Sequence, residues 1–449
     1  MVMALFLRTR LVSPTKAGVV VDETLGPQGG IAEPNFAITS NWRKQVGSNF
    51  FHSFSKFNID KGQSATFSGP GSVHNVVGRV TGGGCSTIDG GINCSIQGAN
   101  LYLVNPGGMV FGPNASLNVS GSFHASTADY LVLSDGGRFD ATHPENSVLT
   151  TAPPSAFGFL NEKPPADITM QGSFLAVPDG QTLSFIGGNL KIKDGVQLNA
   201  FGGRINLASV ASSGAVDLTG SRIATDSFAR LGDIEISNGS FIRSGCYDPG
   251  YNGIDGGSIY IQGGNFVLDD SYLMAESFGG RSGGFIDVFM RNSMSFQHGG
   301  LISTQFSSQT GGNIRFDVGS LSIRDGGWIC NDNYGAGTGG QLSITARDGI
   351  SISGWRKDTN GELIPSQLTS DSYGSGNGGI ISLITGSLSL TDGGRISTDT
   401  SGTGDGGQVS ITVQGNVSLS GFVENADSSI SASGIFLIPP DFVFRFSIL

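Results

Sequence analysis

The chain has 449 residues, of which 72 are glycine, and it carries a formal net charge of −11. Glycine normally supplies about 7% of a protein, so its share here is more than doubled. The acidic balance excludes nucleic acid as an expected partner. No apolar run approaches the roughly 18 residues of a membrane-spanning helix, and the glycines lack the three-residue period of collagen. The composition favours a β-rich extracellular protein.

Residues 1–17 resemble an imperfect export leader. The apolar start MVMALFL precedes Arg8, Arg10 and Lys16, whereas a secretory signal places its positive charge before the apolar run. We interpret residues 1–17 as a defective or truncated leader, the alternative being a true start upstream of Met1.

The segment from Phe51 to Phe57, FHSFSKF, alternates in the way of a β-strand with aromatic side chains packed inward. His52 lies next to Ser53, which raises the question of a catalytic pair. No acidic residue follows at a useful spacing, and no Gly-x-Ser-x-Gly elbow occurs in the chain. We therefore expect a structural strand here.

The four cysteines are too few for a disulfide scaffold. Cys85 and Cys94 lie close together in GGGCSTIDGGINC, and two interpretations remain open for them. They form a disulfide between two strand ends in an oxidising compartment, or they are two small buried apolar side chains. No Cys-x-x-Cys pair occurs and the five histidines lack metal spacing, so we expect no metal and no cofactor.

A tight turn is predicted at Asn105, Pro106, Gly107 and Gly108, between the apolar segments LYLV and MVF. An asparagine side chain accepts a hydrogen bond from the backbone two residues on, proline fixes φ near −65°, and glycine adopts positive φ without strain. The turn would set where the flanking strands begin.

From residue 200 onward, a pair of glycines followed by a short alternating strand recurs. The pairs begin at Gly202, Gly256, Gly283, Gly311, Gly339, Gly378 and Gly406. The intervals are 54, 27, 28, 28, 39 and 28 residues, the first being twice 27. The interval of 39 holds an insertion around GWRKDTNGELIPS. A fixed period of this length predicts a solenoid.

Each repeat is expected to contain three strands. In one repeat Ile314 and Phe316 mark the first strand, Leu321 and Ile323 the second, and Ile329 the third. Because apolar residues alternate with polar ones, one face of each strand points inward. Three strands in about 28 residues fit one coil of an all-β, parallel β-helix, whose coils stack about 4.8 Å apart and whose ends need caps.

Several ordered motifs give a family resemblance over residues 19–200. They are FHSFSKF, NVVGRVTGG at 75–83, the turn at 105–108, FGPNASL at 111–117 and GSFHASTADYL at 121–131. Together they resemble the N-terminal secretion domain of filamentous haemagglutinin and other two-partner secretion exoproteins. The resemblance implies a right-handed parallel β-helix with a capped N-terminus. Gly107 stands where the family usually has asparagine, and since both tolerate the left-handed conformation the turn should survive.

The same resemblance implies a partner and a location. The partner is an outer-membrane β-barrel transporter with periplasmic POTRA domains, which the N-terminal region reaches through the periplasm. The exoprotein crosses unfolded, folds outside and is secreted or held at the cell surface, where family members act as adhesins on a host or cell-surface ligand. The turn at 105–108 then acts in folding or in transporter recognition.

We divide the chain accordingly into the leader candidate (1–17), the N-terminal region (18–200, the secretion domain), the repeat stem (201–434) and an apolar tail (435–449). The tail, IFLIPPDFVFRFSIL, drops glycine abruptly. It either folds back as a cap over the last coil or is the end of a truncated array, and we favour truncation. A truncated, non-functional remnant is one alternative for the whole chain.

A carbohydrate-active enzyme is the other alternative, because parallel β-helices also occur among such enzymes. A glycosidase needs two carboxylates about 5–10 Å apart. Asp269 and Asp270 are adjacent and would face opposite sides, while Asp325 and Asp392 lie in Asp-Gly-Gly turns between the second and third strands, where local capping is expected. The cluster Asn331–Asn333 would line a shallow groove.

Two segments, GSGNGGIIS at Gly374 and GTGDGGQVS at Gly402, partly resemble the glycine-rich turns of calcium-binding β-rolls. Calcium takes six to eight oxygen ligands, and these segments supply few carboxylates. Ordinary glycine turns are the expectation, and we predict no enzymatic activity.

Overall fold

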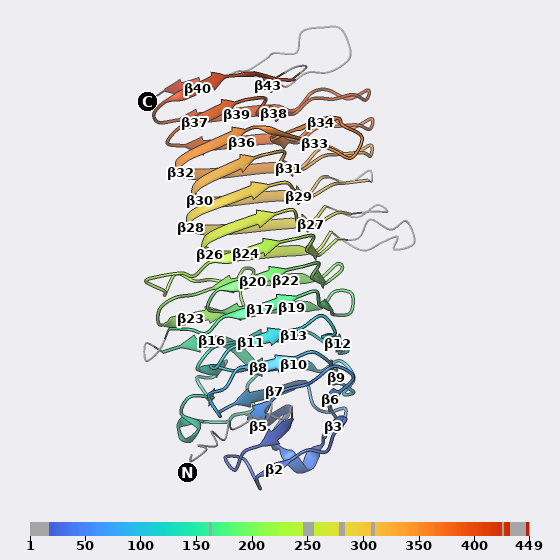
Figure 1. Cartoon of the computed structure of the whole chain (residues 1–449), viewed down its shortest axis with the longest axis vertical. Coiled ribbons are helices and arrows are strands. Elements are labelled where there is room, and N and C mark those ends of the chain that lie inside the picture. Colours follow the sequence, from blue (N-terminus) through green and yellow to red (C-terminus); the bar gives the residue numbers. More distant parts are fainter. Residues whose placement is uncertain are drawn as a thin grey trace, which may run out of the picture.

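The computed structural model describes residues 18–160, 164–245, 256–277, 283–306, 310–423, 426–431 and 446–448. Within these ranges the chain contains two short 3₁₀ turns, η1 (Ser40–Trp42) and η2 (Pro144–Asn146), and otherwise strands. The coils stack into one column from the N-terminal to the C-terminal end (Figure 1). A search of the described residues finds no helix with the length and apolarity needed to cross a membrane.

Two large sheets run along the column over the described residues. The first has 23 strands: β1 (Val19–Val21), β2 (Gly29–Gly30), β4 (Lys44–Val46), β5 (Asn49–Phe57), β7 (Asn75–Val80), β8 (Ser86–Ile88), β10 (Asn100–Val104), β11 (Met109–Phe111), β13 (Phe123–Ser126), β17 (Ile168–Gln171), β19 (Thr182–Gly187), β20 (Leu190–Lys193), β22 (Arg204–Ser209), β24 (Ile234–Ser237), β26 (Ser258–Asp269), β28 (Phe285–Gln297), β30 (Asn313–Arg324), β32 (Gln341–Ser353), β36 (Ile380–Thr385), β37 (Leu388–Thr391), β39 (Gln408–Val413), β40 (Val417–Ser420) and β44 (Phe446–Ile448).

The second sheet has 13 strands and supplies one strand to each coil. They are β3 (Asn35–Ile38), β6 (Ser64–Phe67), β9 (Gly91–Cys94), β12 (Ser116–Asn118), β18 (Phe174–Ala176), β21 (Gln197–Asn199), β25 (Phe241–Arg243), β27 (Tyr272–Met274), β29 (Gly300–Ile302), β31 (Trp328–Cys330), β35 (Gln367–Thr369), β38 (Arg395–Ser397) and β43 (Ser429–Ser431).

The strands of successive coils pair in parallel, and the pairing places like side chains on top of one another. Ile314 of β30 pairs with Ile286 of β28 on one side and with Leu342 of β32 on the other. All three side chains are buried in a single apolar cluster that runs through the column. One coil cannot bury its inward face alone, so stacking supplies the core. The predicted parallel β-helix is confirmed.

The predicted division of each repeat into three strands holds with one refinement. In β26, β28, β30 and β32 the expected first and second strands form one long strand, whose pairing shifts register between them. They separate again as β36 and β37, and as β39 and β40. The insertion in the long interval forms a hairpin of β33 (Trp355–Lys357) and β34 (Leu363–Pro365).

The recurring glycine pairs lie where the backbones of neighbouring coils meet. A Cβ atom added to Gly339 would lie 2.6 Å from Cα of Gly379 in the next coil, and one added to Gly311 would lie 2.9 Å from Cα of Gly340. Real Cβ atoms essentially never approach so closely. The 28-residue period of glycine pairs is therefore a requirement of coil stacking.

Another corner of the column uses the left-handed backbone conformation. Asp325 and Asp392, predicted to lie in turns between the second and third strands, do so with φ of 52°. The equivalent corner is left-handed in other coils too, at Asp194, Asn238, Asp270 and His298. Asparagine and aspartate are among the few residues that adopt this conformation readily.

Two additions join the coils of the N-terminal region, and the second of them includes a strand from the start of the repeat stem. At the N-terminal end, β1 pairs antiparallel with β5 and β2, and β4 pairs antiparallel with β5, which caps the first coil. On its flank a four-stranded antiparallel sheet, here called the flanking sheet, consists of β15 (Arg138–Asp140), β14 (Tyr130–Leu133), β16 (Pro154–Phe159) and β23 (Gly214–Asp217) in that order. Its β16 and β23 lie beside the column in Figure 1. A second apolar cluster joins this sheet to the outer face of the coils.

Candidate functional site

The predicted turn at residues 105–108 connects β10 to β11, and Asn105 organises it. Gly107 N–H donates to Asn105 Oδ1 at 2.8 Å, and Gly108 N–H donates to the Asn105 carbonyl oxygen at 3.1 Å. The Asn105 side chain is fully buried, and its amide nitrogen donates to Gly84 O at 3.0 Å and to Ser86 Oγ at 2.9 Å. This side chain therefore ties the turn to the preceding coil.

The roles of the two glycines in the turn differ from the expectation. Gly108, with φ of 98°, takes the positive conformation, and Gly107 does not. Gly107 is instead limited by space, since an added Cβ would lie 2.6 Å from Gly84 O and 2.8 Å from Gly83 O. The residue that departs from the family pattern thus fits closely against the preceding coil.

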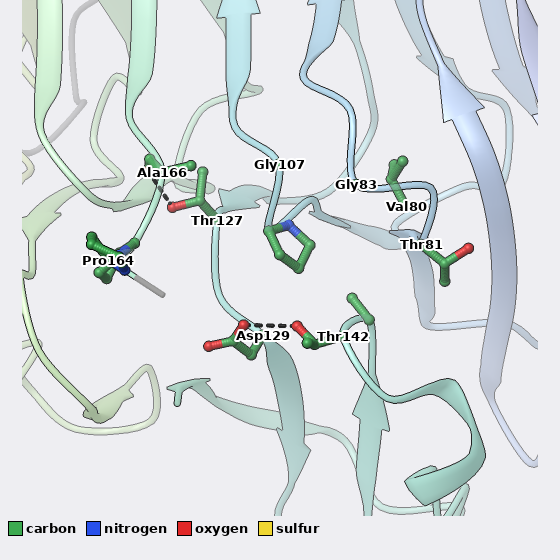
Figure 2. Close-up of a pocket in the computed structure, with 12 residues that line it drawn as sticks. Val80, Thr81, Gly83, Gly107, Thr127, Asp129, Thr142, Pro164 and Ala166 are labelled. Atoms are coloured by element: carbon green, nitrogen blue, oxygen red, sulfur yellow. Dashed lines mark hydrogen bonds between the residues drawn. The ribbon is translucent and has the colours of Figure 1, made fainter. Parts of the chain in front are cut away.

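A pocket of about 360 Å³ opens beside this turn. Its lining residues are Val80, Thr81, Gly83, Pro106, Gly107, Thr127, Asp129, Ala141, Thr142, Pro164, Pro165 and Ala166. Figure 2 shows Gly107 and Gly83 on one side of the pocket, facing Thr127 and the pair formed by Asp129 and Thr142. The pocket therefore brings the turn, the end of β7 and the start of the flanking sheet together.

The polar groups of the pocket wall already have partners within the chain. Thr142 Oγ1 donates to Asp129 Oδ1 at 2.7 Å and Leu160 N–H donates to Asp129 Oδ2 at 2.6 Å, while Thr127 Oγ1 donates to Ala166 O at 2.7 Å. No histidine, cysteine, lysine or arginine is among the lining residues. The Asp129 carboxylate and the Thr127 and Thr142 hydroxyls are therefore engaged in holding the wall together.

His52 and Ser53 do not form a catalytic pair. They lie next to each other on β5, so their side chains point to opposite faces. The His52 ring packs inside the column, 5.4 Å from the Phe67 ring, and burial lowers its pKa to about 4. Ser53 faces outward and donates to Asp22 Oδ2 at 2.6 Å. The prediction of inward aromatic side chains is right for Phe54, whereas Phe51 packs outward in the second apolar cluster.

Of the two interpretations left open for Cys85 and Cys94, the disulfide is not formed, and both thiols are free. Cys85 precedes β8 and Cys94 ends β9, so the two lie at the far ends of successive strands that meet at a corner. Cys94 packs in the core, which matches the alternative interpretation, but Cys85 is exposed. Cys330 is also free, and Cys246 lies outside the described residues.

The acidic residues considered for hydrolysis or metal binding are part of the coil structure. Asn331, Asp332 and Asn333 are all buried, so the shallow groove expected at this cluster is wrong. Asp325 and Asp392 occupy the turn in which the backbone takes the left-handed conformation. Among the residues that the structure describes, no group of three or more histidine, cysteine, aspartate or glutamate side chains is placed to hold a metal ion.

Arg79, within the NVVGRV strand β7, is a central residue that sequence analysis did not single out. Its side chain is fully buried. Its guanidinium donates to Ser53 Oγ at 2.8 Å, to Thr24 Oγ1 at 2.8 Å, to Ser147 Oγ at 2.7 Å and to the Asp140 carbonyl oxygen. The available signal was the charge itself, since Arg79 is the one charged residue in a strand that is buried throughout.

Comparison with known proteins supports one family. A family model described as the TPS secretion domain matches residues 17–261, and no curated protein matches the sequence. The fold is similar to the crystal structure of the HMW1 secretion domain from Haemophilus influenzae, with a TM-score of 0.53 and 17% identity over 93% of this chain and 96% of that one. The crystal structure of a filamentous hemagglutinin secretion domain matches with a TM-score of 0.34 and 14% identity, over 90% and 99%.

Proposed function

Because this chain belongs to the TPS secretion domain family, we propose that its N-terminal region directs export through an outer-membrane β-barrel transporter with POTRA domains. The exported β-helix then serves adhesion or display at the cell surface. The match of the family model to residues 17–261 carries the first part of the proposal. The column of coils, with its large outer surface, supports the second.

We assign the turn at 105–108 and the pocket beside it to one of two roles. They contribute to recognition by the transporter, or to folding of the exported chain. Asn105 is buried and cannot touch a partner in the folded state, so its role is to hold the turn in place. Pro106 and Gly107 are half-buried and line the pocket. A contact with the transporter, if made by the folded domain, would therefore be made by these two residues and by the opposite wall.

An export assay tests the proposal. Residues 18–449 are placed behind a working signal peptide in cells with and without the cognate transporter. We expect the protein in the medium only when the transporter is present, and reduced export of Asn105→Ala. Equal export without the transporter, or accumulation in the periplasm with it, would contradict the proposal.

Asn333→Ala is the matched control for this assay. Asn333 is also a fully buried asparagine whose Oδ1 accepts a hydrogen bond from the backbone two residues on, from Gly335 N–H at 3.0 Å, but it lies in the repeat stem. Both substitutions remove the same kind of turn contact. If Asn333→Ala lowers export as much as Asn105→Ala, the turn at 105–108 has no special part in recognition.

A further inference from the structure

Three parts of the N-terminal region meet at the side chain of Arg79. The first is the segment after β1, where Asp22 Oδ2 accepts hydrogen bonds from Ser53 Oγ and Thr81 Oγ1, both at 2.6 Å. Thr24 Oγ1 donates to Asp22 Oδ1 at 2.7 Å and accepts from Arg79. Residues 22–24 are therefore held both by the coils and by the guanidinium.

The second part is the flanking sheet. Arg79 donates to the carbonyl oxygen of Asp140 at the end of β15 and to Ser147 Oγ just after η2. Its guanidinium carbon also lies 4.2 Å from the centre of the Phe139 ring, within the range of a cation–π contact. The third part is the coil itself, through Ser53.

The environment makes these contacts interdependent. Burial lowers the pKa of Arg79 to about 10, although the carboxylates of Asp22, Asp140 and Glu145 oppose that shift. A buried charge is tolerated when its hydrogen bonds are complete, and the loss of one partner leaves an uncompensated charge in the interior. If residues 22–24 detach from the coils, the guanidinium loses the Thr24 acceptor and the nearby Asp22 charge. Its contacts with the flanking sheet are then weakened as well.

We propose that Arg79 is a latch that couples the docking of the N-terminal segment to the closure of the flanking sheet. Each of the two elements is more stable when the other is in place. Energetic coupling of this kind is reciprocal, so a change at either element must appear at the other. The latch is a property of the folded N-terminal region and stands independently of the export proposal.

Hydrogen exchange on the purified chain tests the latch. Thr24→Val removes one acceptor of Arg79 at an exposed side chain of nearly equal size, so the fold should survive. We expect the amides of β14 to β16 to exchange at least ten times faster, while those of β28 to β32 do not change. Ser147→Ala should in turn speed exchange in residues 19–24. In an Arg79→Met background, adding either substitution should have no further effect on exchange in the distant element.

Asn49→Ala is the matched control. Asn49 Nδ2 donates to Ala152 O at 2.7 Å and to Thr150 O at 3.2 Å, so it links the coils to the loop before β16 without touching Arg79. It should leave residues 19–24 unchanged. The latch is refuted if Thr24→Val and Ser147→Ala each speed exchange only in their own segment, or if Asn49→Ala produces the same distant change.

Discussion

The N-terminal region and the repeat stem hold their coils together by different means. In the N-terminal region, individual side chains such as Arg79 and Asn105 join segments that are far apart in sequence, and the flanking sheet adds a second apolar cluster. In the repeat stem, the same backbone contacts recur from coil to coil at the glycine pairs and at the left-handed corner. The first arrangement relies more on particular side chains, although Gly107 also meets the backbone of the preceding coil, and the second relies on a repeated backbone shape.

The largest difference in stability between the two regions is expected when a methyl group is added at one of the recurring glycine pairs. In Gly339→Ala the new Cβ would meet the backbone of Gly378 and Gly379, which belongs to the next coil and cannot move aside alone. Overpacking of this kind costs about 2 kcal/mol. The loss should appear as a lower urea midpoint for unfolding of the purified chain.

Gly78→Ala is the same change in the N-terminal region. The nearest atoms to an added Cβ there are Cε2 of Phe54 at 3.3 Å and Cδ1 of Leu103 at 3.5 Å, the ends of side chains that can shift. We expect a loss below about 1 kcal/mol, since alanine also restricts the unfolded chain. If Gly339→Ala and Gly78→Ala lower the stability equally, the two regions do not differ in how closely their backbones are stacked.

Buried carboxyl groups in the two regions should respond to pH in opposite directions. Burial raises the pKa of Asp22, but hydrogen bonds from Ser53, Thr81 and Thr24 outweigh it and the net pKa is lowered. Burial and the nearby charge of Asp371 raise the pKa of Asp332 to about 7. Asp22 therefore contributes stability that is present above the unfolded pKa and is lost as pH falls through its folded value.

Asp332 has the opposite sign, because the fold favours its protonated form. Between about pH 4 and pH 7 the unfolded chain loses this proton and the folded chain keeps it, so stability falls as pH rises and levels off above pH 7. Asp332→Asn should reduce this decline and raise stability at pH 8. What remains of the decline belongs to Glu276, whose pKa burial also raises to about 7. Urea unfolding at pH 5 and pH 8 measures the decline.

Asp22→Asn provides the contrasting variant for the same titration. It should lower stability at pH 8 and have its smallest effect in acid, where the wild-type carboxylate is itself protonated. A decline between pH 5 and pH 8 that persists undiminished in Asp332→Asn would mean that Asp332 does not contribute to the pH dependence.

The repeat stem could be predicted from the sequence because its requirements recur. The glycine pairs at a fixed interval and the alternating residues around Ile314 and Leu321 were enough to predict parallel stacked coils. The corner residues were recognised only in part. Asp325 and Asp392 were predicted to lie in turns, but Asn238 and His298 occupy the same corner, and what they share is a backbone angle rather than a residue type.

The N-terminal region was predictable at the level of motifs and not of contacts. The turn at Asn105 was predicted from local turn chemistry, whereas its anchors at Gly84 and Ser86 belong to the preceding coil. Arg79 reaches Ser147, 68 residues further along the chain, and no local pattern indicates such a partner. The sequence distance between Cys85 and Cys94 left two interpretations open for the same reason, since the corner between their strands is not visible in the local pattern.

The smallest expected effect tests whether backbone angle alone defines the left-handed corner. His298 has φ of 54°, which costs a non-glycine residue roughly 1 kcal/mol. Its Nδ1 lies 2.8 Å from Asp269 Oδ1, and since both side chains are more than a third exposed, this contact contributes about 0.5 kcal/mol or less. His298→Gly should therefore stabilise the chain by about 0.5 kcal/mol in urea unfolding at pH 7.5. Asp269→Ala removes the contact without relieving the backbone and should be slightly destabilising. If His298→Gly loses as much stability as Asp269→Ala, the side-chain contact sets this corner, and the repeat stem would resemble the N-terminal region in its dependence on particular side chains.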